Sequence, residues 1–165
     1  MSASPVPIEI RVARPADVPV AGDVVANAYQ ADLSVSDSYL EQLRDTQSRA
    51  AQALLLVAVD GDTVVGSITY ARGGTPLAQR ARLDEAELRM LGVAPAARGR
   101  GIAEALVRAC LEQARADGAI GVVLSTQTQM AAAQRLYERL GFRRRAERDW
   151  VPEPGVQLLA YRRAL

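Results

Sequence analysis

The stretch from Glu87 to Thr126 constrains the fold most, because it passes from a strand pattern to a helix pattern and back to a strand pattern. ELRMLGV predicts a strand, and a turn with two glycines follows it. An amphipathic helix is predicted from Gly101 to Asp117. Its solvated face carries Glu104, Arg108, Glu112 and Arg115. AIGVVLST is a nearly continuous apolar run, typical of a strand buried on both faces.

The N-terminal half adds strands and helices. Three segments have the alternation or apolar character of strands: Ile8–Ala13, Ala53–Val59 and Thr63–Tyr70. The last two are expected to form a hairpin, since Asp60-Gly61 suits a tight turn. Asp17 is expected to cap a helix with an apolar face formed by Val18, Ala21, Val25 and Tyr29. A second, short helix is expected within Ser36–Arg49.

The C-terminal half predicts a loop, a helix and two closing strands. Ala71–Ala86 is a polar loop, and loops of this length are often functional. A helix is predicted from Met130, ended by Gly141 in a left-handed cap. Its apolar face carries Met130, Ala133, Leu136, Tyr137 and Leu140. Closing strands are expected in Arg143–Trp150 and Val156–Ala164, around a turn at Pro152–Gly155. The order β-α-α-β-β-β-α-β-α-β-β indicates one mixed α/β domain over residues 1–165.

Composition excludes several kinds of site. The chain has no histidine, the commonest general base and metal ligand, so any base must be Glu or Asp and we expect no metal. Cys110 is the only cysteine, which excludes an intrachain disulfide and a thiolate metal site. Its place in an apolar stripe favours a small core residue over a reactive thiol.

Charge and hydropathy limit the partners. All 20 basic residues are arginine and 19 residues are acidic, so the formal charge of +1 argues against a nucleic-acid binder. The first ten residues, MSASPVPIEI, lack the basic and apolar regions of a signal peptide. No uninterrupted apolar run approaches the ~18 residues that would span a membrane. We therefore expect a soluble, cytoplasmic protein without nucleic-acid or membrane partners.

The turn at Arg98-Gly99-Arg100-Gly101 favours an anion site. Glycines let a ligand approach the backbone, and the free N–H groups and dipole of a helix start favour a diphosphate. Arg98 and Arg100 are positioned to cover that diphosphate, although an ordinary connection with surface arginines would have the same sequence. A Rossmann fingerprint fails because Glu104 stands where the third glycine belongs, and a Walker A loop fails because the chain has no lysine.

Arg98, Gly101 and Ala103 form the pattern R-x-x-G-x-A, and here the sequence resembles the GCN5-related N-acetyltransferase (GNAT) family. A second segment ends in LYERLGF and is similar to the family's A-x-x-L-Y-x-x-x-G-F. The matching residues are Ala133, Leu136, Tyr137, Gly141 and Phe142. The resemblance implies the acyl-CoA N-acyltransferase fold.

The family resemblance also implies a binding site for acetyl-CoA. The backbone amides of the glycine turn would hold its diphosphate. The turn residues are Arg98, Gly99, Arg100, Gly101, Ile102 and Ala103. The strand before the turn would pair with the pantetheine arm through Leu91, Gly92 and Val93. The family often has Asn seven residues before its tyrosine, where this chain has Met130, so Gln129 or Gln134 would have to replace that contact.

Two residues are candidates for catalysis of acetyl transfer. Tyr137 matches the family's usual acid, and its phenol, with a pKa of about 10, is protonated at neutral pH; from periodicity alone it would be a core residue. Glu87 stands eleven residues before Arg98, where several family members place a catalytic Glu. Its ordinary pKa of about 4.3 requires burial or a bridging water for it to act as a base. Asp84 and Glu85 are alternatives, and a surface pair with Arg89 is the non-catalytic interpretation of Glu87.

The predicted function is acetyl transfer from acetyl-CoA to an amine, with Glu87 as base and Tyr137 as acid. The alternatives are a non-catalytic acyl-CoA-binding regulatory protein of the same fold and an arginine-rich nucleic-acid module. The acceptor stays open among a small amine, an amino acid, an aminoglycoside, a polyamine and a protein terminus. Its pocket is expected on loops, at Tyr29–Tyr39, Ala71–Ala86 and Asp149–Gly155. A homodimer fits the family resemblance.

Overall fold

The structure is a computed structural model that describes residues 6–165. Residues 1–5 lie outside the described residues. They are the first half of the ten-residue segment MSASPVPIEI, which the sequence analysis does not expect to be a signal peptide. The chain forms two compact units. Among the described residues, unit 1 comprises 6–69 and Met90–Ala109, and unit 2 comprises Tyr70–Arg89 and Cys110–Leu165. The described helices are not long and apolar enough to cross a membrane.

Eight strands of residues 6–165 form one open mixed sheet with the order β1-β2-β3-β4-β5-β8-β6, and β7 pairs with β8. The strands are β1 (Glu9–Val12), β2 (Leu54–Asp60), β3 (Thr63–Arg72), β4 (Glu85–Val93), β5 (Gly121–Gln127), β6 (Arg143–Arg144), β7 (Trp150–Glu153) and β8 (Val156–Ala164). The helices are α1 (Asp17–Asp32), α2 (Asp37–Arg44), α3 (Thr46–Gln52), α4 (Ile102–Ala116) and α5 (Ala131–Arg139). The mixed α/β class is therefore confirmed.

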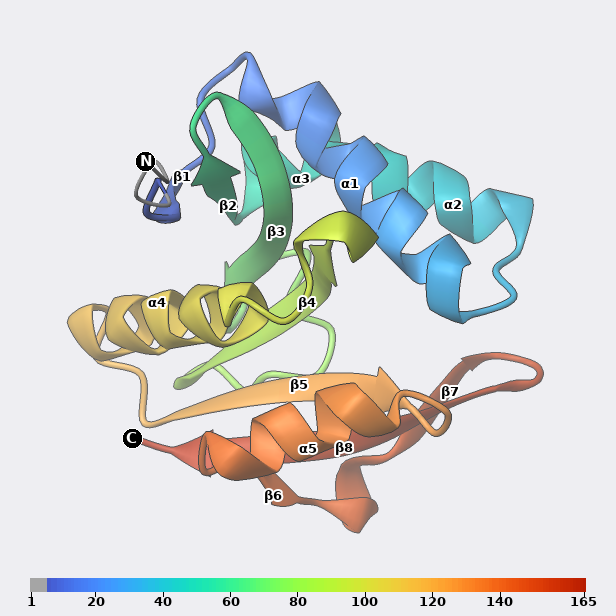
Figure 1. The fold of residues 1–165 in the computed structure, drawn as a ribbon. Coiled ribbons are helices and arrows are strands. Elements are labelled where there is room, and N and C mark those ends of the chain that lie inside the picture. Colours follow the sequence, from blue (N-terminus) through green and yellow to red (C-terminus); the bar gives the residue numbers. More distant parts are fainter. Residues whose placement is uncertain (1–5) are drawn as a thin grey trace. The chain divides into compact units, whose positions relative to one another are not determined.

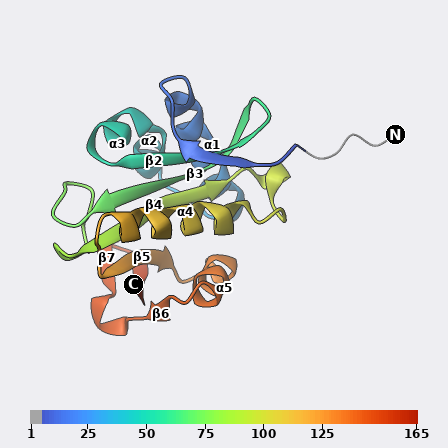
Figure 2. The same ribbon diagram turned by 90° about the vertical axis from the view of Figure 1, so that its left-hand side faces the viewer.

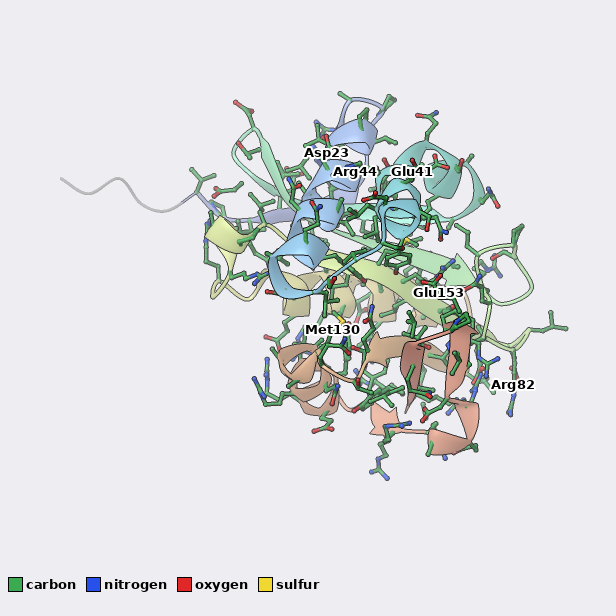
Figure 3. The ribbon with its side chains drawn as sticks, turned by 90° about the vertical axis from the view of Figure 1, so that its right-hand side faces the viewer. Asp23, Glu41, Arg44, Arg82, Met130 and Glu153 are labelled. Atoms are coloured by element: carbon green, nitrogen blue, oxygen red, sulfur yellow. The ribbon has the colours of Figure 1, made fainter. Side chains whose placement is uncertain are left out.

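In unit 1, helices α1, α2 and α3 pack beside one another (Figure 1). The buried face of α1 meets the β2–β3 hairpin through Val18, Ala21, Leu55, Val57, Val59 and Val64. A second cluster joins α1 to α2 through Val25, Ala26, Leu40 and Leu43. On the outside, Arg44 of α2 pairs with Asp23 of α1 at 3.8 Å (Figure 3). The predicted hairpin is confirmed, with Gly61 in its turn at φ 61°.

Two predictions about the N-terminal helices are wrong. Asp17 does not cap α1: Ala16 holds that position, and the Asp17 carboxylate instead accepts the Arg14 N–H at 2.7 Å and pairs with Arg11. The single short helix within 36–49 is two helices that meet at Asp45. The side chain of Asp45 accepts the Ser48 N–H at 3.2 Å, so it starts a new helix where the previous one stops.

In unit 2, β5 pairs with β8 along its whole length, and α5 lies against one face of these strands (Figures 1 and 2). The predicted end of α5 is confirmed. Gly141 has a φ of 86°, and the Phe142 N–H donates to the Tyr137 carbonyl at 2.9 Å.

The predicted strand over Arg143–Trp150 is wrong, because β6 has two residues and a 3-10 turn over Ala146–Arg148 separates it from β7. An Arg144–Asp149 ion pair closes this turn, and Asp149 also accepts the Ala160 N–H at 2.8 Å. The turn between β7 and β8 is also shorter than predicted, since Pro152 and Glu153 belong to β7.

Candidate active site

The glycine turn lies in unit 1, between a 3-10 turn at Pro95–Ala97 and the start of α4. Gly99 and Gly101 have φ angles of 80° and 73°, which side chains rarely adopt, and a Cβ added to either would meet nothing within 4 Å. The first helical bond runs from the Ala105 N–H to the Gly101 carbonyl at 3.0 Å, so the N–H groups just before it have no acceptor within the helix. An exposed backbone with free donors fits a diphosphate.

The two arginines of this turn are held by acids of unit 1. Arg98 pairs with Asp32 at 2.9 Å, and Arg100 pairs with Asp60 at 2.7 Å. Both pairs are partly exposed, and such pairs contribute about 0–1 kcal/mol each. The arginines can therefore leave their acids for another anion at low cost.

The strand before the turn is irregular. Met90 has a φ of 53°, a strained value for a residue with a side chain. A Cβ at Gly92 would come within 3.0 Å of the Val25 Cα, so this glycine lets α1 pack closely on the strand. The parallel pairing of β4 with β5 covers Glu85–Leu88 and Gly121–Leu124, whereas β4 runs on to Val93. Leu91, Gly92 and Val93 thus follow the paired part of β4.

Glu87 lies in unit 2 and is buried, with 4% of its surface exposed. Its Oε1 accepts the backbone N–H groups of Arg80 at 2.6 Å and Ala81 at 2.8 Å, so the β3–β4 loop fixes the carboxylate. Burial raises the pKa of Glu87 above its ordinary value, although these two N–H groups and the charge of Arg89 oppose the shift. Glu87 is therefore not a surface charge, and its raised pKa brings it closer to that of a base working near neutral pH.

The alternative acids differ from Glu87. Glu85 is buried and pairs with Arg148 at 2.8 Å and with Arg162 at 2.6 Å. Burial alone would raise the pKa of Glu85, but hydrogen bonds from both guanidiniums and from the Arg82 N–H lower it to about 2. A carboxylate this acidic is a poor base. The predicted alternative at Asp84 is exposed.

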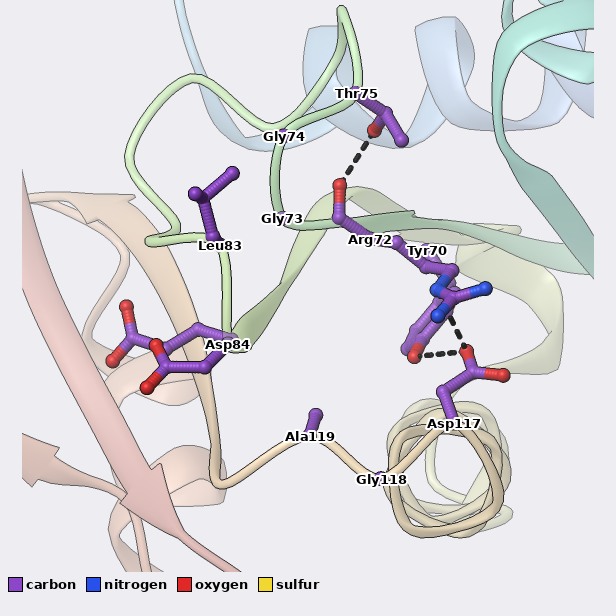
Figure 4. A pocket seen from close by; sticks show the side chains of 11 residues that line it. Tyr70, Arg72, Gly73, Gly74, Thr75, Leu83, Asp84, Asp117, Gly118 and Ala119 are labelled. Carbon is purple, nitrogen blue, oxygen red and sulfur yellow. Dashed lines mark hydrogen bonds and ion pairs between the residues drawn. The ribbon is translucent and has the colours of Figure 1, made fainter.

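Asp84 and Glu85 also line a hollow of about 250 Å³ in unit 2 (Figure 4). In this hollow the Tyr70 hydroxyl donates to Asp117 at 2.7 Å, and Arg72 lies 3.8 Å from the same carboxylate (Figure 4). Burial and this carboxylate raise the pKa of Tyr70, so its hydroxyl stays protonated. The side chains of Tyr70, Arg72 and Asp117 thus have one another as partners.

Tyr137 is buried on α5, with 7% of its surface exposed. Its ring packs edge-on against Phe142, with 5.9 Å between the ring centroids, and lies tilted against the ring of Tyr161 at 6.3 Å. Burial raises the pKa of its hydroxyl above the ordinary value, which keeps the phenol protonated and able to donate. Glu87 and Tyr137 belong to unit 2, whereas the turn and Leu91–Val93 belong to unit 1.

Three further predictions concern polar or reactive side chains near these elements. Met130 precedes α5 and makes no side-chain cap. The Gln134 amide donates to the carbonyls of Gln127 and Thr128 at 3.1 and 3.2 Å, and Gln129 accepts the Thr128 hydroxyl at 3.0 Å, so both glutamines have partners at this helix start. Cys110 is 0% exposed and burial raises the pKa of its thiol to about 12, which confirms a core residue.

Residues 23–142 match the model of the acetyltransferase (GNAT) family. The chain belongs to the GNAT family. N-acetyltransferase 8F1 of Rattus norvegicus is 34% identical over 127 residues, which cover 76% of this chain and 52% of that protein. The chain therefore spans about half the length of this curated relative.

Solved GNAT structures share the fold. A GNAT acetyltransferase from Staphylococcus aureus Mu50 superposes with a TM-score of 0.77 at 16% identity, covering 96% of this chain and 99% of that one. A GNAT acetyltransferase from Brucella melitensis, solved in complex with acetyl-CoA, has a TM-score of 0.64 at 28% identity, covering 94% of this chain and 88% of that one. The predicted family and its fold are thus confirmed.

The sequence predicts a role for the turn and for Glu87, but it does not indicate the residues that surround Glu87. The loop residues Arg80 and Ala81 hold its carboxylate, Arg80 lies 5.1 Å over the ring of Trp150, and the Trp150 indole donates to Ser125 at 3.1 Å. The length of the 71–86 loop pointed to this region. Periodicity could not select Arg80 or Trp150 within it.

Proposed function

We propose that this chain is an N-acetyltransferase that moves the acetyl group of acetyl-CoA to an amine. The observation that carries the proposal is the Glu87 carboxylate, buried, fixed by two loop N–H groups and raised in pKa. A buried carboxylate whose hydrogen bonds come from neutral N–H groups, not from a cation, destabilises the fold. Groups of this kind cluster at functional sites. The Brucella relative in complex with acetyl-CoA supports the choice of donor.

The turn residues Arg98–Ala103 would hold the diphosphate through their free N–H groups, and Leu91–Val93 would hold the amide-bearing arm of the donor. Gly99 and Gly101 leave open space beside the turn, which suits the diphosphate of acetyl-CoA. The residues after Leu88 continue β4 beyond its pairing with β5, which suits the amide-bearing arm. When bound, acetyl-CoA supplies an activated acetyl group on a thiol leaving group.

Glu87 would take the proton of the attacking ammonium, directly or through a water, so that a neutral amine forms the new C–N bond. Tyr137 would give its hydroxyl proton to the sulfur as the C–S bond breaks, so that CoA leaves as a neutral thiol. The second proton lost by the amine nitrogen would return to the Tyr137 phenolate through solvent. The products are an N-acetylated amine and CoA. A non-catalytic acyl-CoA sensor would not need a buried carboxylate of raised pKa, which favours the enzyme over the sensor.

The test is the pH–rate profile of Glu87→Gln beside Glu41→Gln, which alters an exposed glutamate of α2 outside the loops expected to form the acceptor pocket (Figure 3). General-base catalysis is worth about 10²–10⁴-fold, so Glu87→Gln should lose that much turnover at neutral pH and recover part of it at high pH, where the free amine is abundant. Acetyl-CoA affinity should stay unchanged in both variants. An unaltered profile in Glu87→Gln would remove Glu87 from the mechanism.

A further inference from the structure

The face of β4 that carries Glu87 also carries a guanidinium. Residues two apart in a strand point to the same face, so Glu87 and Arg89 share one, with their Cα atoms about 7 Å apart. Both side chains reach the β3–β4 loop: Glu87 binds the N–H groups of Arg80 and Ala81, and an Arg89 guanidinium nitrogen donates to the Leu77 carbonyl at 3.3 Å. A candidate base and a cation therefore lie side by side in unit 2.

Two neighbouring charged residues, Glu85 on the same strand and Arg80 in the loop, have partners in the protein. Glu85 pairs with Arg148 and Arg162. Arg80 lies over the Trp150 ring, and its guanidinium donates to the Arg148 carbonyl at 3.0 Å. Arg89, by contrast, is half-buried, and no carboxylate of residues 6–165 lies within ion-pair distance of it. Its one weak bond to a carbonyl leaves most of its five donors for another group.

The partial burial of Arg89 indicates what kind of group it can bind. A half-buried guanidinium gains most from an anion that can take two parallel hydrogen bonds from its planar fork. Glu87, two residues away, accepts its hydrogen bonds from loop amides rather than from Arg89. The face thus offers an acceptor for an ammonium proton beside an unused site for a carboxylate.

We propose that the acetyl acceptor is a primary amine with a carboxylate close to its amino group, in the manner of an α-amino acid, and that Arg89 binds this carboxylate. The inference rests on the proposed acetyltransferase function and narrows its substrate class. Arg89 would hold the acid group while Glu87 receives the proton of the neighbouring ammonium. Polyamines and aminoglycosides lack the carboxylate and would place a cation against Arg89, so they are poor acceptors.

The experiment measures CoA release by the full chain from acetyl-CoA with matched acceptors. Each of several amino acids of different side chain is compared with its carboxamide and with its decarboxylated amine. A charge-assisted bidentate contact predicts that the free acid has the higher kcat/KM by about 10- to 100-fold, mostly through KM. The carboxamides are the less basic amines and lose their proton more readily, so a preference for the acid must come from the carboxylate.

Variants assign the preference to Arg89. Arg89→Gln should abolish it with unchanged acetyl-CoA affinity by calorimetry, and Arg89→Lys should keep part of it, because lysine retains the charge without the fork. Arg143→Gln makes the same change at an exposed arginine of unit 2 that lies outside the loops expected to form the acceptor pocket, and it should keep the full preference. A thermal melt of each variant checks the fold.

Equal rates for acids and carboxamides, or a preference that survives Arg89→Gln, would overturn this inference and leave the acetyltransferase intact. If none of the amines, carboxylated or not, releases CoA, the acetyltransferase itself is wrong and the inference falls with it.

Discussion

The buried Glu85 predicts a specific loss of stability in acid. Its carboxylate accepts from Arg148 at 2.8 Å and from Arg162 at 2.6 Å, which lowers its pKa from 4.5 to about 2 in the folded chain. A carboxyl whose folded pKa is depressed stabilises the fold above its unfolded pKa and loses that contribution as pH falls through the folded pKa. At 1.36 kcal/mol per unit, this shift is worth about 3 kcal/mol of unfolding free energy, lost between about pH 4.5 and 2.

The assay is urea unfolding followed by the fluorescence of Trp150, the only tryptophan, at several pH values from 6 down to 2.5. Glu85→Gln should cost about 3–5 kcal/mol at pH 6, because it leaves the two arginines without a buried counter-ion. The difference in unfolding free energy between parent and variant should shrink by about 2.5 kcal/mol by pH 2.5. Glu153→Gln, at an exposed position, should stay within about 0.5 kcal/mol of the parent. A gap that is constant across this pH range would refute the depressed pKa.

The remaining predictions concern the turn and the acid. Parent acetyl-CoA binding is expected at micromolar affinity, about −8 kcal/mol, and calorimetry of Gly101→Val should detect none, because the branched side chain enters the diphosphate path. Gly118→Val is the control, because Gly118 has a similar φ of 77° and equally open surroundings, so the substitution causes the same backbone strain. This variant should bind acetyl-CoA normally. Parent-like binding by Gly101→Val would exclude the turn as the diphosphate site. Tyr137→Phe keeps the buried ring and deletes the hydroxyl, so turnover should fall by about 10²–10⁴-fold while the thermal melt and cofactor affinity stay near those of the parent. Normal turnover with an altered melt would make Tyr137 a packing residue only.

Local chemistry made much of the fold predictable. The hairpin at Gly61 and the end of α5 at Gly141 both follow from positive φ angles that glycine adopts without strain. The break between α2 and α3 had a local signal as well: the side chain of Asp45 binds the Ser48 N–H, a capping pattern overlooked within one polar stretch.

The features that were missed depend on distant parts of the chain. The division of 143–150 into β6 and β7 depends on the Asp149 carboxylate, which binds the Ala160 N–H eleven residues away. The different character of Glu85 and Glu87 depends on partners that periodicity cannot indicate. Arg148 and Arg162, 63 and 77 residues from Glu85, hold it ionised, whereas loop amides and burial raise the pKa of Glu87. The glycine turn was predictable because its motif is contiguous.

The most direct measurement follows both products of the reaction together. The full chain is incubated with acetyl-CoA and a panel of amines, free CoA is titrated with a thiol reagent, and N-acetylated product is quantified by mass spectrometry. We predict amine-dependent release of CoA with one equivalent of N-acetyl amine for each CoA. CoA release that is independent of every amine, or acetyl-CoA binding without any release, would contradict it.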